Sequence, residues 1–137
     1  MEIENKQKRY KDGNNCTYSC QYHVIFCPKY KRGVLINGIE TRLKELIKEK
    51  ETDNQYTILE INIFPDHVHL IIDINPTIGI YPIITKIKKY TASILRKEFP
   101  KLKKKLPCLW TRSIFVSTVG SVSVETIKNY IEDQKNV

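Results

Sequence analysis

The sequence predicts one α+β domain, a ferredoxin-like βαββαβ antiparallel sheet with helices on one face, followed by a C-terminal helix. Three observations predict it. One segment alternates hydrophobic and polar residues, two segments carry apolar stripes of helical period, and two further strand-like segments are separated only by a short turn. In chain order these segments are 16–27, 39–50, 55–64, 67–74 and 80–98.

The N-terminal part of the domain begins after a polar segment. Residues 1–15 are polar and charged, and we expect a flexible tail there, with the single domain covering 16–137. In the first strand every second residue from Tyr18 to Phe26 is hydrophobic, and Pro28 ends the alternation. Hydrophobic residues three and four positions apart then indicate the first helix.

The next two strands form a predicted hairpin. Residues 55–64 are rich in Ile and Tyr, and Pro65-Asp66 makes the turn into 67–74. Alternate residues of the second strand should enter the core: Val68, Leu70, Ile72 and Ile74. The residues between them, including both histidines, should face the other way.

The C-terminal half repeats the helix and strand order. A long helix with a period near 3.6 covers 80–98, and a lysine-rich loop follows between Pro100 and Pro107. Residues 109–119 are expected to form the last strand. Ser123 is a suitable cap for a final helix over 124–135.

The charge of the chain favours a polyanionic partner. Lys and Arg number 23 against 15 for Asp and Glu, which gives a net charge of +8. Residues 86–105 alone hold nine basic side chains and one acidic one, Glu98. Nucleic acid suits such a surface, although composition does not separate DNA from RNA. No apolar stretch approaches the roughly 20 residues of a spanning helix, so we expect a cytoplasmic protein with no membrane partner.

The cysteines are too few for a disulfide scaffold. They are interpreted as reduced core thiols, with a structural zinc site as the alternative, although they show no paired C-x-x-C spacing. The four are Cys16, Cys20, Cys27 and Cys108.

Two pairs of residues are candidates for metal binding and catalysis. His67 and His69 share one face of a strand and can bind a divalent cation, while Tyr130 and Gln134 share one face of the last helix. Two imidazoles and an amide form a neutral ligand set, which would leave Mg²⁺ or Mn²⁺ most of its charge for a phosphate oxygen. The alternative is two exposed histidines without a ligand and a tyrosine that packs in the core.

Attack by Tyr130 on DNA would give a covalent phosphotyrosine and a free hydroxyl. That bond keeps the energy of the broken phosphodiester, so strands can be rejoined without ATP. A nuclease that uses water commonly gathers two metals with several carboxylates, and the chain has no obvious carboxylate cluster.

These residues resemble those of the single-tyrosine HUH transposases of small prokaryotic insertion sequences, which move as single-stranded DNA. The resemblance extends from residue 18 to residue 134, and its matching segments are 22–26, 29–32, 65–70, 109–116, 118–120 and 130–134. It implies that His67 and His69 are metal ligands, Tyr130 is the catalytic nucleophile and Gln134 is the third ligand.

The resemblance also implies partners and a reaction. It implies recognition of hairpins at the element's ends, cleavage of one DNA strand to a 5′-phosphotyrosine, and rejoining that excises and inserts the element. It implies a homodimer in which the tyrosine helix of one subunit completes the metal site of the other, with Gly120 as the hinge.

The sequence departs from the family pattern at two points. Lys29-Tyr30-Lys31-Arg32 has lysine where arginine is common, and Ile114 stands where tyrosine is frequent. The sequence also ends three residues after Gln134, so a role of a longer tail in assembly is not expected.

Basic side chains are candidates for phosphate contacts, with a solvated charged face as the alternative. They are Lys29, Lys31, Arg32, Lys86, Lys88, Lys89, Arg96, Lys103 and Lys104. Tyr30, Tyr90 and Trp110 could stack on unpaired bases, although core packing is favoured for Trp110.

Three other functions fit parts of the pattern. The first is a replication-initiator or relaxase-like nickase, and the second is a repeat-associated housekeeping relative. The third is a noncatalytic nucleic-acid-binding domain, which would bind in a salt-dependent manner without a metal requirement.

Overall fold

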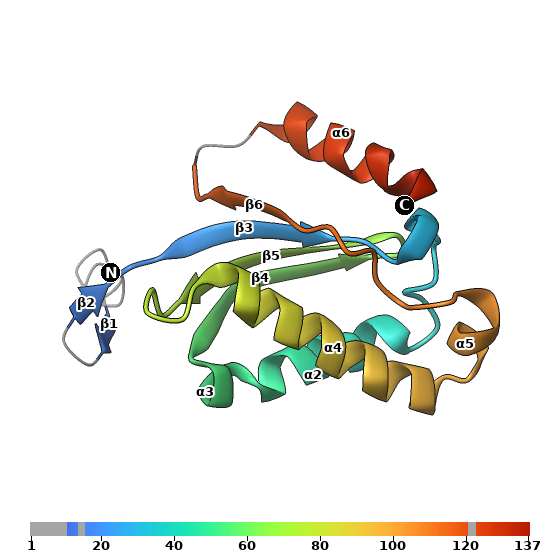
Figure 1. Ribbon diagram of the computed structural model, residues 1–137, viewed down its shortest axis with the longest axis horizontal. Helices are drawn as coiled ribbons and strands as arrows, with labels where there is room; N and C mark the ends of the chain where they lie inside the picture. Colours follow the sequence, from blue (N-terminus) through green and yellow to red (C-terminus); the bar gives the residue numbers. More distant parts are fainter. Residues whose placement is uncertain (1–10, 14–15, 121–122) are drawn as a thin grey trace.

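The computed structural model describes residues 11–13, 16–120 and 123–137. Its centre is a four-stranded antiparallel sheet of order β4-β5-β3-β6. The strands are β3 (Gln21–Phe26), β4 (Tyr56–Phe64), β5 (His67–Ile74) and β6 (Phe115–Thr118). Helices α2 (Ile39–Glu49) and α4 (Ile80–Glu98) cover one face, and α6 (Val124–Asp133) lies on the opposite side (Figure 1). The predicted α+β fold class is confirmed.

The core lies between the sheet and the pair α2 and α4. From β5 it receives every second residue, and Val68, Leu70 and Ile72 are fully inaccessible to solvent. Helix α2 contributes Leu43, Leu46 and Ile47, and helix α4 contributes Ile83, Ile84, Ile87 and Leu95. Because strand side chains alternate between faces, this packing directs His67 and His69 to the face away from α2 and α4.

The register of the sheet fixes which residues surround the histidines. His69 lies opposite Ile25 of β3 and Asn62 of β4, so β5 is paired on both edges. On the next strand, Phe115 of β6 lies opposite Ile25.

The first predicted strand proves to be two. β1 (Lys11–Gly13) and β2 (Cys16–Tyr18) form a separate two-stranded sheet, and β3 begins only at Gln21. Part of the expected tail therefore has strand structure at β1, while residues 1–10 and 14–15 lie outside the described part.

The predicted strand over 109–119 is shorter in the structure, because only β6 pairs continuously with β3. Trp110 makes an isolated bridge with Pro28, whose nitrogen has no hydrogen to donate to a ladder. The Trp110 ring packs edge-on against Phe26 at 4.8 Å between centroids and donates from Nε1 to Thr91 Oγ1 at 3.1 Å. This is the core role favoured for Trp110.

Short helices occupy other segments. The lysine-rich loop instead contains α5 (Lys101–Lys105), anchored by buried Leu102, and α3 (Glu51–Asn54) extends beyond α2. The 3₁₀ helices η1 (Lys29–Lys31) and η2 (Gln134–Asn136) pack against each other, and the backbone nitrogen of Tyr30 donates to the carbonyl of Val137.

The cysteine prediction is only partly correct. Cys27 is buried and Cys20 is half-buried, but Cys108 is exposed, because its segment runs along the surface after α5. All three are free thiols. In the part of the chain that the structure describes, no helix has the length and apolar character needed to cross a membrane.

Candidate metal and tyrosine site

His67 is oriented by the residue before it. Its Nδ1 lies 2.8 Å from Asp66 Oδ1, and its ring stacks on Phe64 with 4.4 Å between centroids. A neutral imidazole that donates from Nδ1 keeps a lone pair on Nε2. Metal-binding histidines commonly have such a carboxylate partner on the second nitrogen.

His69 is contacted by a residue that the sequence analysis did not assign to the site. Its Nε2 lies 3.0 Å from Nδ1 of His23 on β3, and the two rings are 5.2 Å apart between centroids. Burial, followed by the charge of His23, lowers the pKa of His69. The lowered pKa favours the neutral imidazole of His69, which is the form that binds a metal ion.

The last helix begins as predicted. Ser123 caps it, since its hydroxyl accepts from the backbone nitrogen of Thr126 at 3.1 Å, and Glu125 lies in its first turn. These features favour the helix N-terminus through hydrogen bonding and dipole charge.

Tyr130 lies on the same side of the sheet as the histidines. Its ring is 5.4 Å from the ring of Phe115, and its hydroxyl is 2.8 Å from Ser113 Oγ. Burial raises the pKa of Tyr130 to about 12, although the hydrogen bond with Ser113 acts in the opposite direction. The hydroxyl is therefore protonated at neutral pH, and it bonds to Ser113 rather than to a histidine.

Gln134 has an unsatisfied polar atom. The residue is only 5% exposed, and its Nε2 donates to the carbonyl of Tyr130 at 3.3 Å. Its Oε1 is buried and has no hydrogen-bond partner among the residues that the structure describes. Leaving such a group unpaired costs about 1–3 kcal/mol, so this carbonyl oxygen is suited to a cation.

An ionic chain connects the tyrosine helix to the histidine strand. Lys31 Nζ lies 3.6 Å from Asp66 Oδ2 and 3.3 Å from Glu132 Oε1. Since Asp66 also contacts His67, the chain runs from α6 through η1 to the start of β5. It connects the C-terminal end of α6, which directly precedes Gln134, to the end of β5 that carries His67.

The residues that could bind a metal are not part of a cluster of histidine, cysteine and acidic side chains. Among the described residues, no three His, Cys, Asp or Glu side chains are grouped closely enough to hold an ion. His67, His69 and Gln134 instead offer two imidazoles and an amide carbonyl, which is a neutral donor set compatible with Mn²⁺ or Mg²⁺ if water and substrate supply further oxygens.

Several predicted phosphate contacts are already used within the protein. Lys88 donates to the carbonyls of Thr111 at 2.6 Å and Ser113 at 3.1 Å, and burial lowers its pKa to about 8. Lys31 is in the ionic chain, and Arg96 donates to the carbonyl of Pro107.

Other basic residues remain on the surface. They are Arg32, Lys86, Lys89, Lys103 and Lys104, and Lys29 lies against the ring of Tyr30 with 5.1 Å from Nζ to the centroid.

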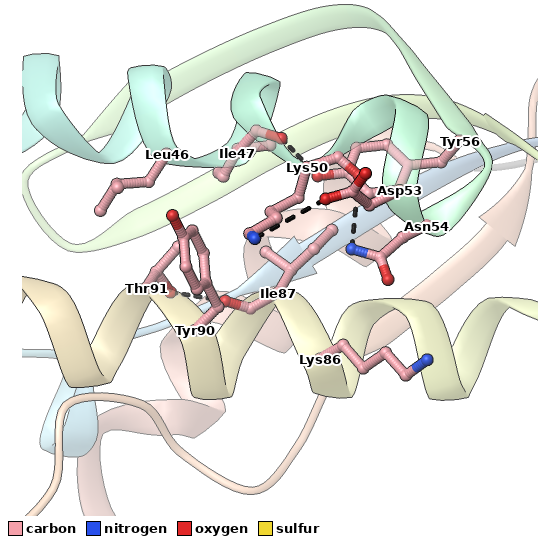
Figure 2. A pocket seen from close by; sticks show the side chains of 10 residues that line it. All are labelled: Leu46, Ile47, Lys50, Asp53, Asn54, Tyr56, Lys86, Ile87, Tyr90 and Thr91. Carbon is pink, nitrogen blue, oxygen red and sulfur yellow. Dashed lines mark hydrogen bonds and ion pairs between the residues drawn. The ribbon is translucent and has the colours of Figure 1, made fainter.

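Pockets lie on both sides of α4. One of about 340 Å³ is lined by residues of α2, α3 and α4, including Lys86 and Tyr90, with Lys50 Nζ 4.6 Å from the Tyr90 ring centroid (Figure 2). It belongs to the helical layer, on the opposite side of the sheet from the histidines. A second, also about 340 Å³, lies between α4 and residues 108–112, and Lys88, Lys89 and Arg112 line it.

The sequence and the fold match a family of transposases. The family model "Transposase IS200 like" matches residues 16–134, and the chain belongs to this family. It is 31% identical over 126 residues to the ISDra2 transposase TnpA of Deinococcus radiodurans, covering 90% of each protein. It is 27% identical over 119 residues to the transposase of insertion sequence element IS200 from Salmonella typhimurium, covering 85% of this chain and 78% of that one.

Solved structures agree with the fold. A crystal structure of a Deinococcus radiodurans R1 protein assigned as a transposase superposes with a TM-score of 0.81 at 30% identity, covering 93% of this chain and 99% of that one. A REP-associated tyrosine transposase bound to a REP hairpin has a TM-score of 0.55 at 13% identity, covering 82% of this chain and 62% of that one. This similarity shows a shared fold.

The half-buried ammonium of Lys88 predicts a measurable pH effect on stability. Its pKa is lower in the folded than in the unfolded protein, so between about pH 8 and pH 10.5 the unfolded state binds more protons. Wild type should therefore gain stability relative to Lys88→Met as pH rises from 7 to 10, measured by urea unfolding. Lys89→Met, at the exposed neighbour, is the control and should follow wild type. Parallel pH profiles for wild type and Lys88→Met would contradict the burial of this charge.

Proposed function

We propose that this transposase cleaves and rejoins single-stranded DNA with Tyr130 as nucleophile and with Mg²⁺ or Mn²⁺ held by His67, His69 and Gln134. The observation that carries this proposal is the buried, unpartnered Oε1 of Gln134, one helical turn beyond Tyr130. The ionic chain through Lys31 supports it, because it connects that turn to the strand of the two histidines.

The proposed reaction is a balanced exchange of phosphodiesters. An ion held by His67, His69 and Gln134 would supply Lewis-acid stabilisation of charge on the scissile phosphate. The Tyr130 oxygen attacks phosphorus, the bond from phosphorus to the 3′ oxygen breaks, and a proton ends on that 3′ oxygen. The products are a 5′-phosphotyrosine and a free 3′ hydroxyl. Attack by another 3′ hydroxyl reverses these steps and joins new ends.

The environment of Tyr130 sets a requirement for this step. With a pKa of about 12, the phenol is almost entirely protonated at neutral pH. Its proton must therefore be removed before or during the attack on phosphorus. Ser113 Oγ, 2.8 Å away, is placed to hold the hydroxyl until DNA enters.

We propose hairpin-forming single-stranded DNA as the substrate. The net charge of +8 suits a polyanion, and the REP-associated relative is described as bound to a hairpin. An insertion-sequence end is favoured over a chromosomal repeat, because the identity to the ISDra2 transposase is 31%, whereas the REP-associated protein is 13% identical.

A homodimer with exchanged tyrosine helices is also part of the proposal. No residue of α6 is fully buried, so this helix packs lightly on its own sheet. Gly120, with a φ of 92° and open space around it, precedes the helix as the proposed hinge.

Replacing the nucleophile tests the chemistry. Tyr130→Phe should abolish covalent attachment to a single-stranded oligonucleotide while leaving hairpin binding nearly unchanged, because only the phenol oxygen is lost. The oligonucleotide should be labelled at its 3′ end, since the proposed link is to the 5′ side of that fragment. Denaturing electrophoresis detects the adduct, and Tyr90→Phe is the control. An adduct formed equally by Tyr130→Phe would refute the role of this residue.

The variant Gln134→Leu tests whether Gln134 binds the metal ion or only packs within the protein. Leucine removes the unpaired buried carbonyl, so the free energy of unfolding should stay the same or rise. If Gln134 binds the ion, the Mn²⁺ concentration needed for half-maximal cleavage should increase about tenfold or more. Lower stability with an unchanged Mn²⁺ requirement would instead identify a packing role.

Heterodimers of two inactive variants test whether the tyrosine helix of one subunit serves the metal site of the other. Tyr130→Phe and His67→Ala are each expected to be inactive alone. If the tyrosine of one subunit serves the histidines of the other, refolding the two variants together should restore cleavage, because one site per heterodimer is then intact. Continued inactivity of verified heterodimers would show that each subunit uses its own tyrosine.

A further inference from the structure

We propose that His23 is a positioning residue of the metal site, which accepts a hydrogen bond from Nε2 of His69 and leaves Nδ1 of His69 free for the ion. This inference rests on the proposed function, in which His69 is a ligand. It concerns a residue of β3 that lies 46 positions before His69 in the chain.

The contact between the two rings requires one proton. His23 Nδ1 and His69 Nε2 are 3.0 Å apart, with an angle of 34° between the ring planes. Two lone pairs or two N–H groups at that distance would repel, so one nitrogen donates and the other accepts.

The direction of the hydrogen bond decides whether neutral His69 can bind an ion. If His23 donated, the proton of His69 would be on Nδ1, and its Nε2 lone pair would be used by His23. Neither nitrogen would then be available to an ion. If His69 donates from Nε2, its Nδ1 carries a free lone pair. A functional metal site therefore selects the second arrangement.

The same logic applies to the other histidine. Asp66 engages Nδ1 of His67 and leaves Nε2, whereas His23 engages Nε2 of His69 and leaves Nδ1. Each imidazole thus has one nitrogen fixed by a neighbour. Fixing the second nitrogen sets the tautomer and the ring orientation, and losing such a partner typically costs 10- to 100-fold in metal affinity.

The backbone of His23 is well placed for this role. β3 is an interior strand, paired with β5 on one side and with β6 on the other, and His23 lies opposite Ile71 and Ser117. The next residue, Val24, is fully buried in the core. The imidazole of His23 is therefore presented from a backbone held on both edges.

A direct ligand role for His23 is the competing interpretation. The described residues contain no group of three histidine, cysteine or acidic side chains that could hold an ion, so His23, His67 and His69 do not form a three-histidine cluster. This favours a partner of His69 over a third imidazole ligand.

Two variants isolate the hydrogen bond. In His23→Asn, Oδ1 can occupy the position of Nδ1 and accept from His69, whereas His23→Leu keeps a branched side chain without an acceptor. We expect His23→Leu to weaken Mn²⁺ binding 10- to 100-fold and His23→Asn to remain close to wild type. Electron paramagnetic resonance of free Mn²⁺ measures this without DNA, and urea unfolding verifies that both variants are folded.

Two spectroscopic readouts complete the test. In the metal-free protein, long-range ¹H–¹⁵N spectra should show His69 with its proton on Nε2, and a proton on Nδ1 would overturn the proposal. With Mn²⁺ bound, electron spin echo should detect two imidazole ligands. Three ligands, with one lost in His23→Leu, would overturn the positioning role in favour of direct ligation.

The variant His69→Ala distinguishes failure of the proposed role of His23 from failure of the proposed metal site. If it loses Mn²⁺ while His23→Leu binds as tightly as wild type, the role of His23 alone is wrong. If His69→Ala also binds Mn²⁺ like wild type, the metal site of the proposed function fails, and the role of His23 fails with it.

Discussion

The site depends on the alternation of buried and outward side chains along β5. Val68, Leu70 and Ile72 are fully buried beneath α2 and α4, so His67 and His69 must emerge together on the other face. A slip of one residue would bury both imidazoles and expose the core set. Because β5 is hydrogen-bonded to β3 and to β4, the hydrophobic packing that stabilises the domain also fixes the position of the histidines.

Unlike β5, the helix α6 that carries Tyr130 is not fixed by core packing. No residue of α6 is fully buried, and its contacts with the rest of the protein include the Phe115 ring, the Ser113 hydroxyl and the ion pair with Lys31. An exposed ion pair contributes little stability, about 0–1 kcal/mol. The rigid histidine strand and the lightly held helix fit the proposed reaction, in which Tyr130 approaches DNA, becomes attached to it and later transfers it.

Local patterns in the sequence predicted much of this arrangement. Alternation placed the two histidines on one face, and the cap at Ser123 marked the start of α6. Pairings between distant segments were not predictable in this way. His23 reaches His69 only through the register of β3 on β5, and Lys88 is half-buried where its ammonium donates to the carbonyls of Thr111 and Ser113. Pro28, beside Trp110, explains why the last strand is shorter than its hydrophobic pattern.

The central claim is that a divalent ion binds between the two histidines and Gln134. The most direct measurement is the anomalous diffraction of crystals grown with Mn²⁺ and a hairpin oligonucleotide. We expect one strong peak within bonding distance of both imidazoles and of Gln134 Oε1. A peak that leaves both histidines without a metal contact, or no peak at all in crystals that bind the DNA, would contradict it.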